Sequence, residues 1–206
     1  MSCDTWLDTT CYRDLQQVQG RTIDGGLALA ILGELARAEE PTATTVAKKL
    51  RQDTRVIQRC LNALEAVLVL QKLAPHPMGV GKPHYLLCDA GIATHLGASR
   101  NTQLRTHVLS ESLAYLENAG LGRPLLRYYR NEKTSRIPII LEWVAAKSAP
   151  TSMAIQIFDG ESPGTRDTQS LHSFAARLER PLRYLMLTQE NESYKEGPIE
   201  FHPLRG

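Results

Sequence analysis

A cluster of basic side chains in the middle of the chain has the composition and the spacing for contacts with phosphates and with base edges. The cluster consists of Lys48, Lys49, Arg51, Arg55 and Arg59, and Asp53 alone interrupts it. Lysine and arginine neutralise phosphate groups, and arginine also donates two hydrogen bonds to guanine in the major groove. Most charged helical runs are only solvated surfaces, so the elements that carry the cluster decide what it can do.

Three helices in succession are predicted around this cluster, after an N-terminal helical arm over residues 1–20. Residues 27–36 form a strongly helical run, and Thr42 can cap a second, short helix. After a polar turn, Asp53 or Thr54 is a suitable N-cap for the third helix. Two short helices joined by a tight turn are the arrangement that places side chains in a DNA major groove.

The third helix has a buried side and a solvent-facing side. A stripe at helical spacing, which we expect to be buried, consists of Ile57, Leu61, Leu64 and Leu68. The opposite side, which we expect to face solvent, carries Arg55, Gln58, Arg59 and Asn62. The helix therefore presents polar and basic side chains outward.

A β-hairpin is predicted directly after the third helix. Residues 67–70 and 85–87 have the composition of two short strands, and the Gly/Pro-rich loop between them, residues 75–84, carries Lys82. The order helix–helix–helix–hairpin indicates a winged helix-turn-helix domain over residues 21–97. We expect its DNA-facing set to be Lys48, Lys49, Arg51, Thr54, Arg55, Gln58, Arg59 and Lys82.

From residue 98 to residue 206 the pattern changes to that of a mixed α/β domain with one core sheet. Helices are predicted at 104–116 and 167–178, strands at 125–129, 137–141, 153–158, 183–187 and 199–202, and polar loops at 147–151 and 159–168. The predicted fold class is therefore α+β, with an N-terminal winged helix-turn-helix followed by this mixed domain.

Short motifs along nearly the whole chain resemble one family. They are Trp6-Leu7, Tyr12-Arg13-Asp14-Leu15, Leu61-Asn62-Ala63-Leu64-Glu65, Lys82-Pro83-His84-Tyr85, Cys88-Asp89-Ala90-Gly91-Ile92, Glu111 and Leu171-His172-Ser173-Phe174. The chain resembles the C-terminal region of a prokaryotic AAA-type ATPase family, in which the nucleotide-binding domain precedes a winged helix and a restriction-endonuclease-like domain. No ATPase domain is expected within this chain, because Gly79-Val80-Gly81-Lys82-Pro83 lacks the first glycine and the serine or threonine of a phosphate-binding loop.

The resemblance implies that the second domain has a PD-(D/E)XK nuclease fold. Such nucleases hold a divalent metal with an acidic residue on one strand and an acid-x-Lys pair on the next, often with a helical glutamate. The resemblance aligns Pro138 and Gln156 with the acidic positions, Phe158 with the lysine and Glu111 with the helical glutamate. Proline and phenylalanine offer no ligand, and an amide binds a hard cation more weakly than a carboxylate. We therefore expect a degenerate nuclease domain with no catalytic residues, no metal and no cofactor.

Two alternatives stay open for these positions. A shift of register would bring Glu142 and Asp159 into the site as migrated ligands, because residues four apart on a strand, such as Pro138 and Glu142, share a face. Glu111 is either a relic of the metal site or a structural partner of Arg127 or Arg130, and we favour the structural role.

Charge and composition narrow the class of protein. The net charge is only +2, but residues 43–97 hold seven basic and three acidic side chains, whereas residues 1–42 hold three basic and seven acidic ones. Positive charge in the middle segment favours a phosphate-bearing partner. The sequence has no C-x-x-C pair, no apolar run long enough for a membrane span and no signal peptide after Met1. We expect a cytoplasmic protein in which Cys60 is a buried structural thiol.

The leading hypothesis is a non-enzymatic protein that binds double-stranded DNA through the winged helix. The degenerate nuclease fold would then serve as a docking or dimerisation platform. The alternative is a protein-interaction adaptor for a separate ATPase or a larger complex, and a less favoured third hypothesis is a metal-dependent nuclease with migrated ligands. The expected partners are double-stranded DNA, a protein such as an ATPase, or a second copy of the chain, and no membrane.

Overall fold

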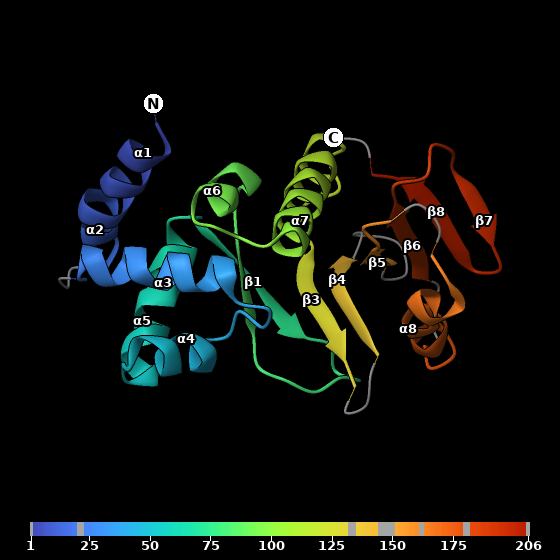
Figure 1. The fold of residues 1–206 in the computed structure, drawn as a ribbon, viewed down its shortest axis with the longest axis horizontal. Helices are drawn as coiled ribbons and strands as arrows, with labels where there is room; N and C mark the ends of the chain where they lie inside the picture. Colours follow the sequence, from blue (N-terminus) through green and yellow to red (C-terminus); the bar gives the residue numbers. More distant parts are fainter. Residues whose placement is uncertain are drawn as a thin grey trace. The chain divides into compact units, whose positions relative to one another are not determined.

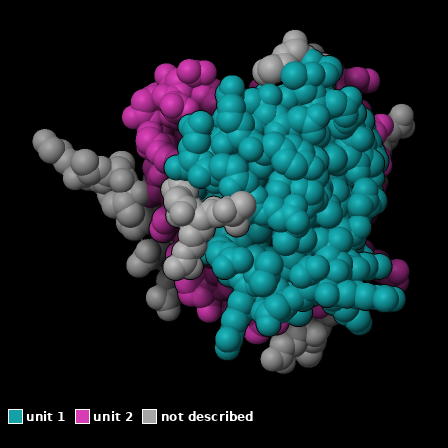
Figure 2. Space-filling view, turned by 90° about the vertical axis from the view of Figure 1, so that its left-hand side faces the viewer, with its two compact units in different colours: residues 1–73, 83–110 teal, residues 74–82, 111–206 magenta. Residues whose placement is uncertain are grey.

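The chain is a mixed α/β protein (Figure 1). The computed structural model describes residues 2–19, 23–131, 135–143, 151–160, 163–178 and 182–204, so most of the loop predicted at 147–151 lies outside the described residues. Two compact units are present: unit 1 is Met1–Leu73 with Pro83–Ser110, and unit 2 is Ala74–Lys82 with Glu111–Gly206 (Figure 2). The domain bounds predicted from the sequence, 21–97 and 98–206, stay a prediction.

Unit 1 begins with three short helical segments, α1 (Cys3–Thr9), the π-helical η1 (Thr10–Asp14) and α2 (Leu15–Gln19). The helices α3 (Gly25–Arg37), α4 (Ala43–Leu50) and α5 (Thr54–Ala66) follow. After them come the strands β1 (Leu70–Pro75) and β2 (His84–Leu87), the helix α6 (Ala90–His95) and the first part of α7 (Arg100–Asn118). The three predicted helices α3, α4 and α5 are thus confirmed.

Polar side chains fix where these helices begin. The hydroxyl of Thr42 accepts a hydrogen bond from the backbone N–H of Thr45 at 3.1 Å at the start of α4. The carboxylate of Asp53 accepts one from the backbone N–H of Arg55 at 2.6 Å, so Asp53, and not Thr54, is the N-cap of α5. Each cap satisfies a backbone donor that the first helical turn leaves without an intrahelical partner.

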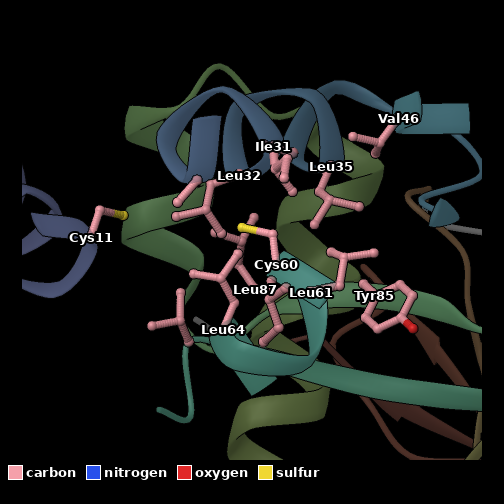
Figure 3. Close-up of a cluster of buried hydrophobic side chains, with 14 of the residues drawn as sticks. Cys11, Ile31, Leu32, Leu35, Val46, Cys60, Leu61, Leu64, Tyr85 and Leu87 are labelled. Carbon is pink, nitrogen blue, oxygen red and sulfur yellow. The ribbon is translucent and has the colours of Figure 1, made fainter. Parts of the chain in front are cut away.

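The core of unit 1 lies between α3, α5 and the N-terminal arm (Figure 3). Its fully buried side chains include Ile31 and Leu32 of α3 and Ile57, Leu61 and Leu64 of α5. Cys60 is buried among them, as expected, and burial raises the pKa of its thiol to about 12. Cys11 of the N-terminal arm is also buried, and burial raises the pKa of that thiol to about 11. Both thiols are therefore protonated, structural groups.

The first strand of the predicted hairpin is present, but its predicted bounds, residues 67–70, are wrong, and so is the burial predicted for Leu68. Val67 is the C-cap of α5, and the N–H of Val69 donates to Leu64 O at 3.0 Å, which closes the helix end. Leu68 between them has a φ of 62° and is 59% exposed. The apolar run 67–70 resembles a strand in composition, but its first three residues form the C-terminal end of α5 and the turn that follows it. The strand β1 therefore begins only at Leu70.

Strand β1 contributes to the pairing of both units. Its first residues pair antiparallel with β2, from Leu70 opposite Leu87 to Leu73 opposite His84. Its last residues, Ala74 and Pro75, pair parallel with β3. On the other edge of β2, the N–H of Tyr85 donates to Pro41 O at 2.8 Å, and His84 forms an isolated antiparallel bridge with Thr42.

Unit 2 is built on a mixed sheet. Its strands are β3 (Leu125–Arg130), β4 (Arg136–Trp143), β5 (Thr151–Ile157), β6 (Leu182–Thr188), β7 (Tyr194–Glu196) and β8 (Ile199–Pro203), in the order β1-β3-β4-β5-β6-β8-β7. The pairs β5–β6 and β6–β8 are parallel, and β3–β4, β4–β5 and β7–β8 are antiparallel. The helix α8 (Thr165–Ala175) packs on the sheet through Leu171 and Phe174, which meet Tyr129, Met186 and Phe201. The strands and the helix predicted for this region are present, and β7 was missed.

Candidate nucleic-acid interface

The last turn of α4 presents two lysines to solvent. Lys48 and Lys49 are both exposed, while Val46 and Ala47 on the other side of the helix are buried. Positive side chains are favourable at this end because the helix dipole places partial negative charge there. The apolar residues of α4 thus pack into the protein, and its two lysine side chains are exposed to solvent.

The turn between α4 and α5 is short and has an unusual backbone conformation. Arg51 has a φ of 52° and a ψ of 42°, in the left-handed region, and its N–H donates to Ala47 O. The N–H of Gln52 also donates to Ala47 O, at 3.0 Å, and Asp53 then caps α5. The left-handed residue lets the chain reverse within three residues, and the side chain of Arg51 is exposed.

The outward side of α5 carries Arg55, Arg59 and Asn62, all exposed and spaced as one stripe. Thr54 is also exposed at the start of the helix. Among the residues that the structure describes, no carboxylate forms an ion pair with the predicted cations on α4, the turn and α5, namely Lys48, Lys49, Arg51, Arg55 and Arg59. We call these five residues the basic surface. Their charges are available to an external anion.

Gln58 differs from the expectation that it faces solvent. The side chain is half-buried and not fully exposed. Its Nε2 donates to the hydroxyl of Tyr85 at 2.8 Å and to Oδ1 of Asn62 at 2.9 Å. The contact with Tyr85 was not predicted, because the two residues are 27 positions apart in the sequence. The amide nitrogen of Gln58 is therefore used in hydrogen bonds within the protein, whereas the side chain of Asn62 is exposed to solvent.

The loop after β1 belongs to unit 2 and lies along β3. The N–H of His76 donates to Tyr128 O at 2.8 Å, and the hydroxyl of Tyr128 donates to Lys82 O at 2.8 Å. Gly81 has a φ of 137°, and a Cβ on it would lie 2.1 Å from the hydroxyl oxygen of Tyr128. Lys82 is exposed, but its backbone is held in unit 2, whereas the basic surface belongs to unit 1.

A partly buried cluster of His76, Arg127 and Glu142 was not predicted. His76 is buried, its Nε2 lies 3.3 Å from Oε1 of Glu142, and its Nδ1 accepts from the N–H of Met78 at 3.2 Å. The Nε of Arg127 donates to the other carboxylate oxygen of Glu142. Burial lowers the pKa of His76 and Arg127 lowers it further, against the opposite effect of Glu142. The imidazole is therefore neutral and carries its proton on Nε2.

The positions aligned with the nuclease ligands are close together along two strands. Pro138 is next in register to the pair Ile139–Ile155 of β4 and β5, which places it opposite Gln156. The Oε1 of Gln156 is buried without a hydrogen-bond partner among the described residues, and Phe158 packs against the apolar core of unit 2. Glu111 is exposed on α7. No cluster of His, Cys, Asp and Glu suited to a metal ion occurs in the described part of the chain.

The residues considered as migrated ligands or structural partners make other contacts. Glu142 is engaged by Arg127 and His76, and Asp159 accepts a hydrogen bond from Gln189 Nε2 at 2.6 Å. The ion pair expected between Glu111 and Arg127 or Arg130 is wrong, since Glu111 makes no ion pair with any described residue. Arg127 instead meets Glu142, because the two lie on adjacent, paired strands.

The chain has a weak likeness to a solved structure. No family model and no curated protein matches the sequence. The crystal structure of the transcriptional regulator PA3341 is similar at 24% sequence identity and a TM-score of 0.30, covering 56% of this chain and 90% of the regulator. At this level of similarity the match carries no functional weight. Separately, no helix of the described residues combines the length and apolar character needed to cross a bilayer.

Proposed function

We propose that the chain is a non-catalytic protein that binds double-stranded DNA. In this proposal α3, α4, α5 and the strands β1 and β2 act as a winged helix-turn-helix, with α5 in the major groove. The observation that carries the proposal is the basic surface, five exposed cations without carboxylate partners among the described residues, gathered on two capped helices and the turn between them. Positive charge concentrated on such a helix pair is the electrostatic footprint of a DNA-binding module.

The two ends of the basic surface have different expected roles. Lys48, Lys49 and Arg51 lie at the end of α4 and in the turn, where they would meet the phosphate backbone. Arg55 and Arg59 lie along the exposed stripe of α5, where a guanidinium can donate two hydrogen bonds to guanine. The first group supplies affinity and the second also supplies sequence preference.

Binding of labelled duplex DNA to the intact chain tests this proposal. Replacement of Arg55 and Arg59 with alanine should weaken binding by at least tenfold, since each removes a charge-assisted contact. Arg13→Ala is the matched control, because Arg13 is an exposed arginine of the N-terminal arm that pairs with Asp14 at 3.0 Å. Equal affinities of the wild type and the double variant for duplex DNA would contradict the proposal.

For unit 2 we propose the role of a docking or dimerisation platform with a nuclease-like fold that has lost its metal ligands. The support is chemical: the aligned positions hold Pro138, Gln156 and Phe158, and the nearby Glu142 is engaged by Arg127 and His76. Incubation with plasmid and Mg²⁺ or Mn²⁺ tests the loss of activity. Cleavage that a Glu111→Ala change abolishes would overturn it.

A second candidate function, an adaptor for a protein partner such as an ATPase, is favoured by exposed apolar side chains of unit 2. Tyr115, Leu121 and Leu125 are 71%, 47% and 61% exposed, at the end of α7, in the following loop and at the start of β3. Large apolar side chains left exposed in one region are typical of interaction surfaces. If the adaptor function is the main one, Leu125→Asp abolishes complex formation while the Arg55 and Arg59 replacements leave it intact.

A further inference from the structure

A hydrogen-bonded chain of three side chains connects the core of unit 1 to its exposed stripe. Tyr85 of β2 is only 1% exposed, and its hydroxyl accepts a hydrogen bond from Gln58 Nε2 at 2.8 Å. The same Nε2 donates its second proton to Oδ1 of Asn62 at 2.9 Å, one helical turn further along α5. Both amide protons of Gln58 are thus used within the protein.

This chain fixes the amide of Asn62. Because Oδ1 faces Gln58, both protons on Nδ2 are left for groups outside the protein, and Oδ1 keeps one free lone pair. An exposed asparagine without such a contact samples several rotamers, whose loss on binding would reduce affinity. Asn62 lies on the stripe that also carries Arg55 and Arg59, so the three exposed residues share one face of α5.

We propose that Asn62 is a specificity-determining residue that recognises adenine in the major groove, with Gln58 and Tyr85 as positioning residues. This inference rests on the proposed function. The Nδ2–H of Asn62 donates to N7 of adenine, and its Oδ1 accepts from the N6 amino group, a pairing that matches donor to acceptor at both atoms. Guanine presents two acceptors at N7 and O6, which suit Arg55 and Arg59 and not an amide.

The test begins with selection of duplexes from a randomised pool by the wild-type chain, followed by affinity measurements on the selected sequence. We expect one adenine position at which Asn62→Ala lowers the preference for adenine by roughly tenfold or more. Replacement of that adenine with 7-deazaadenine, which lacks only the N7 acceptor, should weaken binding of the wild type and leave binding of Asn62→Ala unchanged. That non-additivity identifies the contact between the two groups.

Tyr85→Phe tests the positioning role, because it removes one hydroxyl from a buried ring and keeps the volume. It should reduce the adenine preference partway toward that of Asn62→Ala while the dependence of affinity on salt stays at the wild-type value. An Arg13→Ala variant should change neither quantity.

The outcomes separate the inference from the function on which it rests. If the wild type binds no duplex at low salt, the proposed function fails and this inference fails with it. If duplexes bind but Asn62→Ala selects the same bases as the wild type, the proposed function stands and the role of Asn62 is overturned. If Asn62→Ala changes the selection and Tyr85→Phe does not, the positioning role of Tyr85 is overturned.

Discussion

Arg51 combines a strained backbone conformation with a charge that the proposed contact with DNA would use. Its φ of 52° places it in the left-handed region, which costs a residue with a Cβ roughly 1–2 kcal/mol. Glycine avoids that cost but loses about 0.4–1 kcal/mol through the greater freedom of the unfolded chain. Arg51→Gly should therefore raise the free energy of unfolding by about 0.5–1 kcal/mol.

The same change removes one cation of the basic surface. If Arg51 contacts a phosphate, Arg51→Gly makes the negative slope of log affinity against log salt shallower by about 0.9. Arg51→Ala is the matched control, because it removes the guanidinium and keeps the Cβ, so it weakens binding equally without the gain in stability.

Urea unfolding of the intact variants, followed by circular dichroism, measures the first effect, and fluorescence anisotropy with duplex DNA measures the second. The expected order of stability is Arg51→Gly above wild type, with Arg51→Ala no more stable than wild type. An Arg51→Gly chain no more stable than Arg51→Ala would refute the strain argument. Wild-type affinity in both variants would show that Arg51 makes no phosphate contact.

Three further predictions follow from other parts of the structure. Leu68 also has a positive φ, of 62°, and is 59% exposed, so Leu68→Gly should raise the free energy of unfolding by about 0.5–1 kcal/mol in urea titrations whereas Leu68→Ala should not. Burial lowers the pKa of His76 below its value in the unfolded chain, so its contribution to stability is present above about pH 6.5 and is lost as the pH falls through the lower, folded pKa. His76→Asn, which keeps an acceptor for Met78 N–H but does not titrate, should show a shallower loss of stability between about pH 7 and pH 5, and identical pH profiles would contradict the neutral imidazole. Finally, the wild-type chain should leave supercoiled plasmid intact in Mg²⁺ or Mn²⁺ on agarose gels, because Pro138 and Phe158 provide no ligand for a metal.

Patterns that depend on neighbours in sequence were predicted correctly. The caps Thr42 and Asp53 and the buried residues Ile57, Leu61 and Leu64 of α5 follow from helix periodicity and local hydrogen bonding. The exposure of the cations was also predictable, because burial of an unpaired charge costs free energy and the side of a helix opposite its apolar stripe faces solvent.

Features that depend on distant residues could not be predicted. The contact of Gln58 with Tyr85 and the cluster of His76, Arg127 and Glu142 join residues far apart in sequence, and only the sheet pairing brings them together. The exposure of Leu68 was missed for a different reason: its apolar character continues the stripe of α5, but the helix ends two residues earlier. The short strand β7 was missed because all three of its residues are exposed and lack an apolar pattern.

The salt dependence of duplex binding tests the central claim most directly. Fluorescence anisotropy of the intact chain between about 50 and 200 mM salt should give a log–log slope near −3, because the three cations assigned to the phosphate backbone, Lys48, Lys49 and Arg51, would each displace about 0.9 counterions. The double replacement of Lys48 and Lys49 with alanine should reduce the magnitude of that slope by about 2, whereas Arg13→Ala should leave it unchanged. Absence of duplex binding at low salt, or a slope that the double variant shares with the wild type, would contradict a DNA interface on α4 and α5.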